Sequence, residues 1–216
     1  VKKMRKFTAF LVLVLLAVAS VQAQSVVKQL SLKSEILGVQ KTYSVYLPDG
    51  YGKSGEKYPV LYLLHGAWGT DFAWVNKKSG NMQEIVDAAI AKGEAKKMII
   101  VMPDARGEGE RNGGKNMGYF NVENWSYMDF FFQEFIPHID KTFRTIATKE
   151  GRAIAGLSMG GHGSALFAMS RPEYFSSAYL MSARLSGVPE ISPDRTEDYV
   201  EMLREYEFTR IFPEMT

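Results

Sequence analysis

The pattern of apolar and polar residues changes along the chain, and its first part alternates. Segments 26–33 and 40–47 place apolar side chains at every second position, which is typical of strands with one face toward solvent. A short connection joins them, so we expect an antiparallel hairpin at one edge of a sheet. Pro48-Asp49-Gly50 then ends the second strand as a turn.

Later strands are apolar almost without interruption, and amphipathic stretches separate them. Strands that are apolar on both faces belong to parallel sheets covered by helices on both sides. The strand segments are 58–64, 98–102, 153–157 and 178–181. The helical segments are 81–92, 127–143, 159–170 and 197–208. This order predicts an α/β protein with a mostly parallel, doubly wound central sheet and helices on both faces.

The N-terminal residues predict export. Four basic residues within 2–6 precede an apolar run at 7–19, and Val21-Gln22-Ala23 follows as a small-residue cleavage signal. This order is that of a secretory signal peptide over 1–23. The apolar run is shorter than the ~20 residues that a spanning helix needs. We therefore expect a secreted or periplasmic domain over 24–216, without a membrane anchor after leader removal.

The leader also accounts for the positive charge of the chain. The chain has 26 basic and 24 acidic residues, of which the leader holds four basic and no acidic ones, so the remainder carries a net charge near −2. That balance gives no electrostatic basis for binding nucleic acid. Cysteine is absent, which excludes disulfides, a thiol nucleophile and a thiolate metal site. We expect no metal and no organic cofactor.

Gly156-Leu157-Ser158-Met159-Gly160 fits the G-x-S-x-G pattern of a nucleophile elbow. An apolar strand enters the motif and a helical segment leaves it, which is the context that the motif requires. The serine of an elbow sits in a strained turn, and glycines two residues away let backbone segments pass closely. We predict Ser158 as a catalytic nucleophile, with a glycine-rich packing turn as the alternative.

An elbow serine needs an oxyanion hole. One donor is expected to be the Met159 N–H, at the start of the following helix, where the dipole favours negative charge. The second is expected from the loop after an earlier strand, which here is His65-Gly66-Ala67-Trp68-Gly69. Gly66 would let the Ala67 N–H face the elbow. A tight turn without an active-site role is the alternative.

The chain contains three histidines, and none of them is expected to be the catalytic base. His65 is interpreted as a loop-orienting residue, and His138 as a partly exposed residue of a helix. His162 lies one turn into the helix after Ser158, which suits packing or capping better than a position opposite the hydroxyl. No histidine follows His162, so the sequence shows an incomplete triad.

Five sequence blocks occur in a characteristic order. They are YPVLYLLHGAWG at 58–69, Asp71 followed by Trp74, MIIVMPD at 98–104, FIPHID at 135–140, and RAIAGLSMGGHGSALFA at 152–168. With these blocks, residues 27–183 resemble the putative-esterase family of α/β-hydrolases. That family includes feruloyl and acetylxylan esterases, S-formylglutathione hydrolase (esterase D) and mycobacterial mycolyltransferases.

The resemblance implies the α/β-hydrolase fold, Ser158 as nucleophile, and the Met159 and Ala67 N–H groups as oxyanion donors. In the family the acid and the histidine follow two further strands, beyond the position of Thr216, so we expect a chain truncated at its C-terminus. We expect an exported serine carboxylic-ester hydrolase that removes acetyl or feruloyl groups from carbohydrate. An acyltransferase of the same fold and a non-catalytic remnant or pseudoenzyme stay open as alternatives.

The substrate is expected to be a small-molecule or polysaccharide ester. The long polar loop at 104–120 follows the carboxyl end of a parallel strand, where substrate-contacting loops gather. Trp68 and Tyr119 are candidate substrate-binding residues, and Trp74 and Trp125 are further aromatic residues of the same kind. Packing of these aromatic rings against the body of the protein is the alternative. The sequence makes no prediction about oligomeric state.

Overall fold

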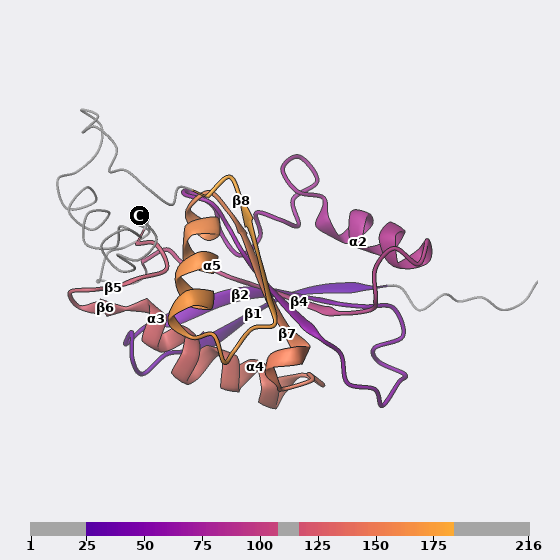
Figure 1. The fold of residues 1–216 in the computed structure, drawn as a ribbon, viewed down its shortest axis with the longest axis horizontal. Coiled ribbons are helices and arrows are strands. Elements are labelled where there is room, and N and C mark those ends of the chain that lie inside the picture. Colours follow the sequence, from indigo (N-terminus) through magenta and orange to yellow (C-terminus); the bar gives the residue numbers. More distant parts are fainter. Residues whose placement is uncertain (1–24, 108–116, 184–216) are drawn as a thin grey trace, which may run out of the picture.

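A six-stranded sheet organises the chain in the computed structural model, which describes residues 25–107 and 117–183 (Figure 1). The strand order is β1-β2-β4-β3-β7-β8, where β2 pairs antiparallel with β1 and β4, and the other neighbours are parallel. The strands are β1 (Val26–Lys33), β2 (Gln40–Leu47), β3 (Val60–Leu64), β4 (Ile99–Pro103), β7 (Arg152–Leu157) and β8 (Ser177–Met181). The mostly parallel sheet predicted from the apolar runs is confirmed.

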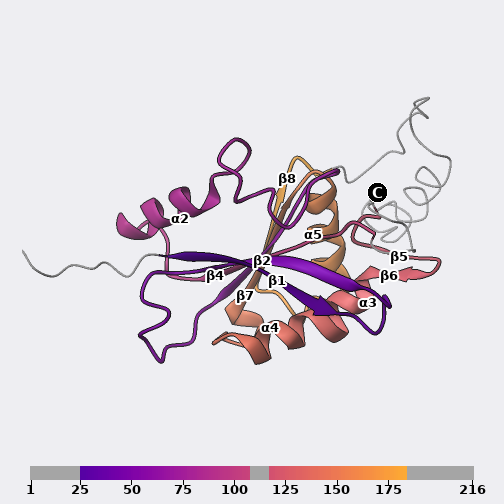
Figure 2. The ribbon, with the colours of Figure 1, turned by 180° about the vertical axis from the view of Figure 1, so that it is seen from behind.

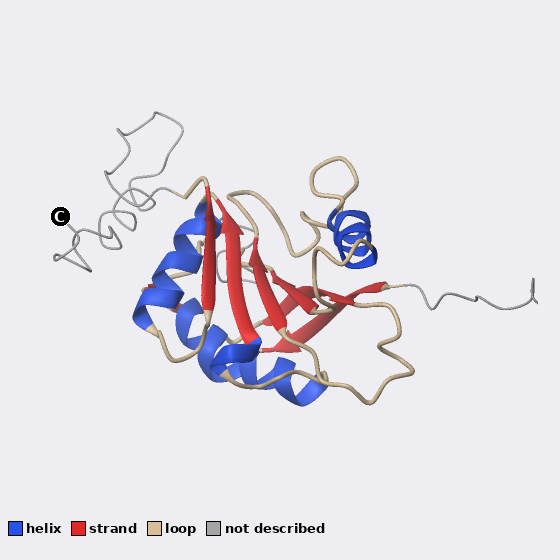
Figure 3. Cartoon of the chain, turned by 45° about the vertical axis from the view of Figure 1, so that its right-hand side comes forward, coloured by secondary structure: helices blue, strands red, loops and turns tan. Residues whose placement is uncertain are grey.

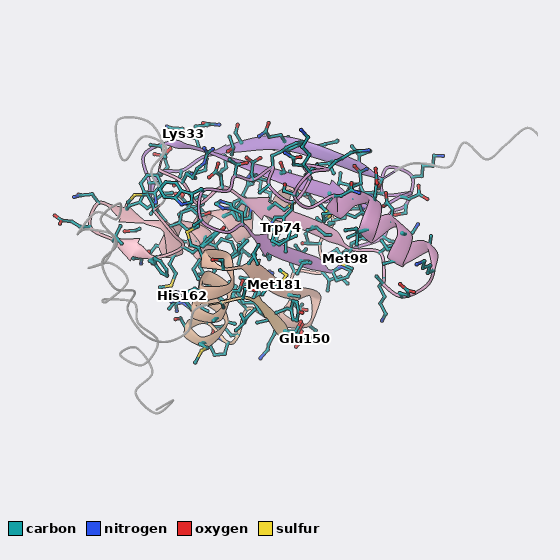
Figure 4. All side chains as sticks on the ribbon, turned by 90° about the horizontal axis from the view of Figure 1, so that it is seen from above. Lys33, Trp74, Met98, Glu150, His162 and Met181 are labelled. Carbon is teal, nitrogen blue, oxygen red and sulfur yellow. The ribbon has the colours of Figure 1, made fainter. Side chains whose placement is uncertain are left out.

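The predicted hairpin forms one edge of this sheet. Val26 pairs with Leu47 and Lys33 with Gln40, so both strands have the predicted bounds. β1 alternates between exposed and half-buried positions, as expected of an edge strand with one face toward water, whereas β2 is almost entirely buried. In Figure 4, Lys33 marks this edge and His162 marks the opposite side of the molecule.

Helices cover both faces of the sheet, as predicted (Figures 2 and 3). The larger core lies between the sheet and a helical stretch made of α3 (Tyr127–Phe130), a π-helical turn (Phe131–Phe135) and α4 (Ile136–Thr142), together with α5 (Met159–Ser170). Aromatic rings fill this core, and the Phe131 and Phe167 centroids lie 4.6 Å apart. Such pairs add about 0.5–1.5 kcal/mol each beyond the area that they bury.

α2 (Met82–Ala91) lies over the other face of the sheet, opposite α5 (Figure 1). Its Asp87 ties the helix to the sheet, because the carboxylate accepts hydrogen bonds from Ser25 Oγ at 2.5 Å and Tyr46 Oη at 2.7 Å. Burial and the neighbouring Asp87 carboxylate raise the pKa of the Tyr46 hydroxyl, so it stays a donor. A small core under α2 includes Leu63, Ile100 and Met102.

The short elements complete the description. They are β5 (Asn121–Val122) and β6 (Trp125–Ser126), which form a separate hairpin, and the 3₁₀ turn η2 (Lys149–Gly151). The helix expected at 197–208 lies outside the described residues. Across 25–107 and 117–183, the structure has no helix with the length and apolar character needed to cross a membrane.

Glu134, in the π-helical turn, fixes the connection between β1 and β2. Its carboxylate accepts hydrogen bonds from Ser34 Oγ at 2.6 Å, Glu35 N at 3.0 Å and Ile36 N at 3.1 Å. We predict that Glu134→Ala lowers the free energy of unfolding by about 1–3 kcal/mol, because it removes three hydrogen bonds, of which those from Ser34 and Ile36 are part-buried. Urea denaturation measures this change.

Glu35→Ala is the matched control, because it removes a neighbouring carboxylate whose side chain is 79% exposed and keeps the backbone N–H. It should stay within about 0.5 kcal/mol of the wild-type protein. Equal effects of the two substitutions would contradict the anchoring role of Glu134.

Candidate active site

Ser158 lies in the turn between β7 and α5 with a positive φ of 55° and a ψ of −114°. Such a conformation is uncommon for a residue other than glycine and costs of the order of 1–3 kcal/mol. Hydrogen bonds on both sides hold it: Ser158 N–H donates to Met181 O at 2.8 Å, and Ser158 O accepts from His162 N–H at 2.9 Å. The strained strand–helix turn expected from the motif is confirmed, and Ser158 is exposed at its tip.

The two glycines of the motif allow α5 to approach the sheet closely. A Cβ atom on Gly160 would lie 2.4 Å from Leu64 O, at the end of β3, and one on Gly156 would lie 2.2 Å from Gly160 O. Contacts this short with backbone atoms are not possible, so a side chain at either position would push α5 away from β3 and β7. The two glycines of the motif are therefore required in this fold because a side chain at either position has no room.

The loop after β3 passes directly beside the elbow. A Cβ atom on Gly66 would lie 3.7 Å from Ser158 Cβ and 3.3 Å from Leu157 O. Gly69 N–H donates to Gly66 O at 3.1 Å, which closes the loop as a tight turn. Within 25–107 and 117–183, neither the Ala67 N–H nor the Met159 N–H donates a hydrogen bond. Two candidate oxyanion donors thus belong to segments that meet at Ser158.

His65 joins this loop to its surroundings. The ring is 1% exposed, its Nδ1 lies 2.8 Å from Gly66 O, and its Nε2 lies 3.0 Å from Ala105 N. The backbone oxygen of His65 accepts a hydrogen bond from the Tyr119 hydroxyl at 3.1 Å. The interpretation of His65 as a loop-orienting residue agrees with these contacts.

Asp71 anchors the far end of the same loop. Its carboxylate is 2% exposed and accepts hydrogen bonds from Gln29 Nε2 at 2.9 Å and Ser44 Oγ at 2.8 Å. These partners lie on β1 and β2, so the loop is tied across the antiparallel edge of the sheet. A buried carboxylate that kept no partner would be strongly destabilising.

A buried charged group lies at the end of β4, which sequence reasoning missed. Arg106 Nη2 donates to Asp104 Oδ2 at 2.7 Å, and the Arg106 N–H donates to Asp104 Oδ1 at 2.8 Å. Lys41, 1% exposed, donates to Arg106 O at 2.5 Å. Burial alone would raise the pKa of Asp104, but the hydrogen bonds from Arg106 and the nearby Lys41 charge outweigh it and lower that pKa well below its usual range. The sequence signal that could have indicated this group is Asp104 itself, the last residue of the block MIIVMPD.

The other two histidines each contact an aromatic residue. His138 is half-buried, and its Nε2 lies 2.8 Å from the Tyr43 hydroxyl. Burial lowers the pKa of His138, and the Lys141 charge adds to this shift. The His162 ring packs edge-on against Phe120, with 5.2 Å between centroids. In the part of the chain that the structure describes, no group of three His, Asp or Glu side chains could hold a metal ion.

The candidate aromatic residues divide into two groups. Trp68 is 81% exposed and has a positive φ of 64°, directly after the candidate oxyanion donor Ala67. Tyr119 and Trp125 are 0% exposed, and Trp74 is half-buried. Tyr119, predicted as a candidate substrate-binding residue, packs inside the core, with its ring 5.7 Å from the His65 ring. For Tyr119 and Trp125 the packing alternative holds.

The close approach of α5 gives a test of the elbow. We predict that Gly160→Ala destabilises the protein by about 1–3 kcal/mol through overpacking, although alanine normally favours a helix. Gly55→Ala is the control, since no atom lies within 4 Å of its added Cβ. Thermal denaturation compares the two, and a Gly160→Ala protein as stable as the control would contradict the steric account.

Comparisons with known proteins agree with this architecture. A solved ferulic acid esterase superposes with a TM-score of 0.76 at 36% identity, covering 87% of this chain and 71% of that one. An endo-1,4-beta-xylanase/feruloyl esterase of Xylanibacter ruminicola is 39% identical over 180 residues, which is 81% of this chain and 24% of that protein. An esterase of Mycobacterium tuberculosis is 36% identical over 146 residues, 68% of this chain and 30% of that protein.

The chain thus spans 24% and 30% of the length of these two curated relatives. The family model described as "Putative esterase" matches residues 34–206, which is most of the chain. The mostly parallel central sheet with helices on both faces is that of the α/β-hydrolase fold. The chain belongs to this esterase family.

Proposed function

We propose that the protein is a serine carboxylic-ester hydrolase that works through an acyl-enzyme on Ser158. The observation that carries the proposal is the strained, exposed Ser158 turn, beside which the N–H groups of Ala67 and Met159 have no other acceptor among the described residues. Backbone strain at a non-glycine residue is costly and persists where the surrounding structure enforces it, often at catalytic sites. Belonging to an esterase family supports the same assignment.

The reaction follows from this geometry. Ser158 Oγ attacks the carbonyl carbon of the ester, and the Ala67 and Met159 N–H groups stabilise the oxyanion of the tetrahedral intermediate. The intermediate collapses with loss of the alcohol, which takes up a proton, and leaves an acyl-Ser158 ester that water then hydrolyses. A general base must accept the Ser158 proton, and we assign this role to none of the three histidines.

For the substrate, we propose acetyl or feruloyl esters of carbohydrate. Two relatives support this class by name, a ferulic acid esterase and an endo-1,4-beta-xylanase/feruloyl esterase, and both are more than 30% identical to the chain. The exposed Trp68 ring beside the oxyanion loop suits an aryl group or a sugar face, which aromatic rings bind by stacking. Export through the 1–23 signal sequence, which lies outside the described residues, would bring the protein to such polymers.

We predict that Ser158→Ala lowers kcat for p-nitrophenyl acetate and methyl ferulate by at least about 10³-fold, because no acyl-enzyme can form. Ser158→Gly should be equally inactive but as stable or more so, since glycine accepts a positive φ without strain.

Ser176→Ala is the control, because that hydroxyl bonds Arg152 O at the opposite end of β7. Wild-type turnover by Ser158→Ala would exclude Ser158 as the nucleophile. An inactive wild-type protein would favour the pseudoenzyme alternative, and acyl transfer to an added sugar would favour the acyltransferase.

We predict that Trp68→Ala lowers kcat/KM for a feruloylated oligosaccharide by about 10-fold, the loss of one aromatic stacking contact. The value for p-nitrophenyl acetate should change by less than about 2-fold, because this small substrate does not reach the ring. Ile85→Ala, an exposed apolar residue on α2, is the control. Equal losses on both substrates would show that Trp68 shapes the loop rather than binding the substrate.

A further inference from the structure

The hydrogen-bond partners at the two nitrogens of the His65 ring require the same tautomer. Gly66 O is an acceptor, so His65 Nδ1, 2.8 Å away, must carry a proton. Ala105 N–H is a donor, so His65 Nε2, 3.0 Å away, must be unprotonated. The two contacts together require a neutral imidazole with its proton on Nδ1.

The Asp104 carboxylate is the group that could disturb this tautomer, because its Oδ1 lies 3.7 Å from His65 Nε2. Arg106 engages it instead, with Nε 3.2 Å from Oδ1 and 3.1 Å from Oδ2, in addition to the two shorter contacts described above. The carboxylate is thereby satisfied without a proton from the ring. Because Arg106 pairs with the Asp104 carboxylate, His65 Nε2 can remain unprotonated and accept the hydrogen bond from Ala105 N–H.

The oxyanion loop wraps around the same ring. Gly66 O accepts from both His65 Nδ1 and Gly69 N–H, and a Cβ on Gly69 would lie 2.9 Å from Nδ1. Gly66 O and the Ala67 N–H belong to one planar trans peptide and point in opposite directions, so the position of Gly66 O sets the direction of that N–H. Tyr119, bonded to His65 O, holds the residue from the other side.

We propose that His65 is a positioning residue for the oxyanion hole. Its neutral ring connects Gly66 O to Ala105 N–H, couples the loop after β3 to the loop after β4, and fixes the direction of the Ala67 N–H toward Ser158. This inference rests on the proposed function, since it assigns a role to His65 in that reaction. The oxyanion forms in the transition state, so loss of this coupling affects kcat more than substrate binding.

Two substitutions each interrupt the coupling at one atom. His65→Asn keeps a side-chain donor near the Nδ1 position and lacks the acceptor for Ala105, whereas His65→Gln keeps an acceptor near the Nε2 position and lacks the donor to Gly66. We expect each to lower kcat by about 10–100-fold. This decrease is at most similar to the decrease in kcat caused by removing one oxyanion donor. KM for p-nitrophenyl acetate should stay within about 3-fold, with activity normalised to the folded fraction.

His138→Gln is the matched control, because it makes the same exchange at a histidine bonded to Tyr43, away from Ser158. It should keep kcat within about 2-fold of the wild-type value. If both His65 variants fold and keep wild-type kcat, or if KM rises while kcat is unchanged, the positioning role is wrong.

¹⁵N NMR of the wild-type protein tests the inference without any assay of activity. We expect a His65 ring protonated at Nδ1 and unprotonated at Nε2, and an Ala105 amide whose hydrogen exchange accelerates in His65→Asn. An Nε2-protonated ring would overturn the inference while leaving the proposed function standing. Wild-type turnover by Ser158→Ala would instead overturn the proposed function, whatever the tautomer of His65.

Discussion

The site depends on the close contact between the first turn of α5 and the end of β3. Gly160 lies against Leu64 O with no room for a Cβ, and Gly156 lies equally close to Gly160 O. This contact brings the start of the helix beside the loop that leaves β3. It therefore sets the distance between the two N–H groups that are proposed to share one oxyanion. If α5 lay farther from the sheet, the two N–H groups could not bind one oxyanion, and the strained turn at Ser158 would have no catalytic role.

Buried polar groups hold the loops around Ser158. Asp71 ties the loop after β3 to β1 and β2, and His65 ties it to the loop after β4. The buried Asp104 pairs with the half-buried Arg106 next to that tie. Buried polar groups with all partners in place rigidify a structure, because any displacement leaves a costly unsatisfied group. A rigid loop keeps its donors oriented before the substrate arrives, which is what electrostatic stabilisation of a transition state requires.

Much of this arrangement could be predicted from the sequence because it depends on local patterns. The alternation at 26–33 and 40–47 gave both strands with their observed bounds, and the run after Ser158 gave α5 over Met159–Ser170. The strained turn followed from the spacing of Gly156, Ser158 and Gly160. These features need no knowledge of distant partners.

Other features depend on contacts between segments far apart in the chain. Tyr119 follows a polar, glycine-rich loop, and nothing in that loop shows that the ring turns inward and its hydroxyl bonds His65 O. Lys41 on β2 is buried, and its acceptor, Arg106 O, lies on the loop after β4. The π-helical turn at Phe131–Phe135 interrupts a segment expected to be a regular helix, and it buries Phe131, Phe132 and Phe135 together. Pattern reasoning cannot separate these outcomes from their alternatives.

Labelling of the protein with a fluorophosphonate tests the central claim most directly, because the reagent forms a stable adduct with an activated serine and mimics the tetrahedral intermediate. Peptide mass spectrometry then locates the adduct. The account predicts one adduct per protein, on Ser158, and loss of labelling when the protein is unfolded first. Stoichiometric labelling of another residue, with Ser158 unmodified in the folded protein, would contradict it.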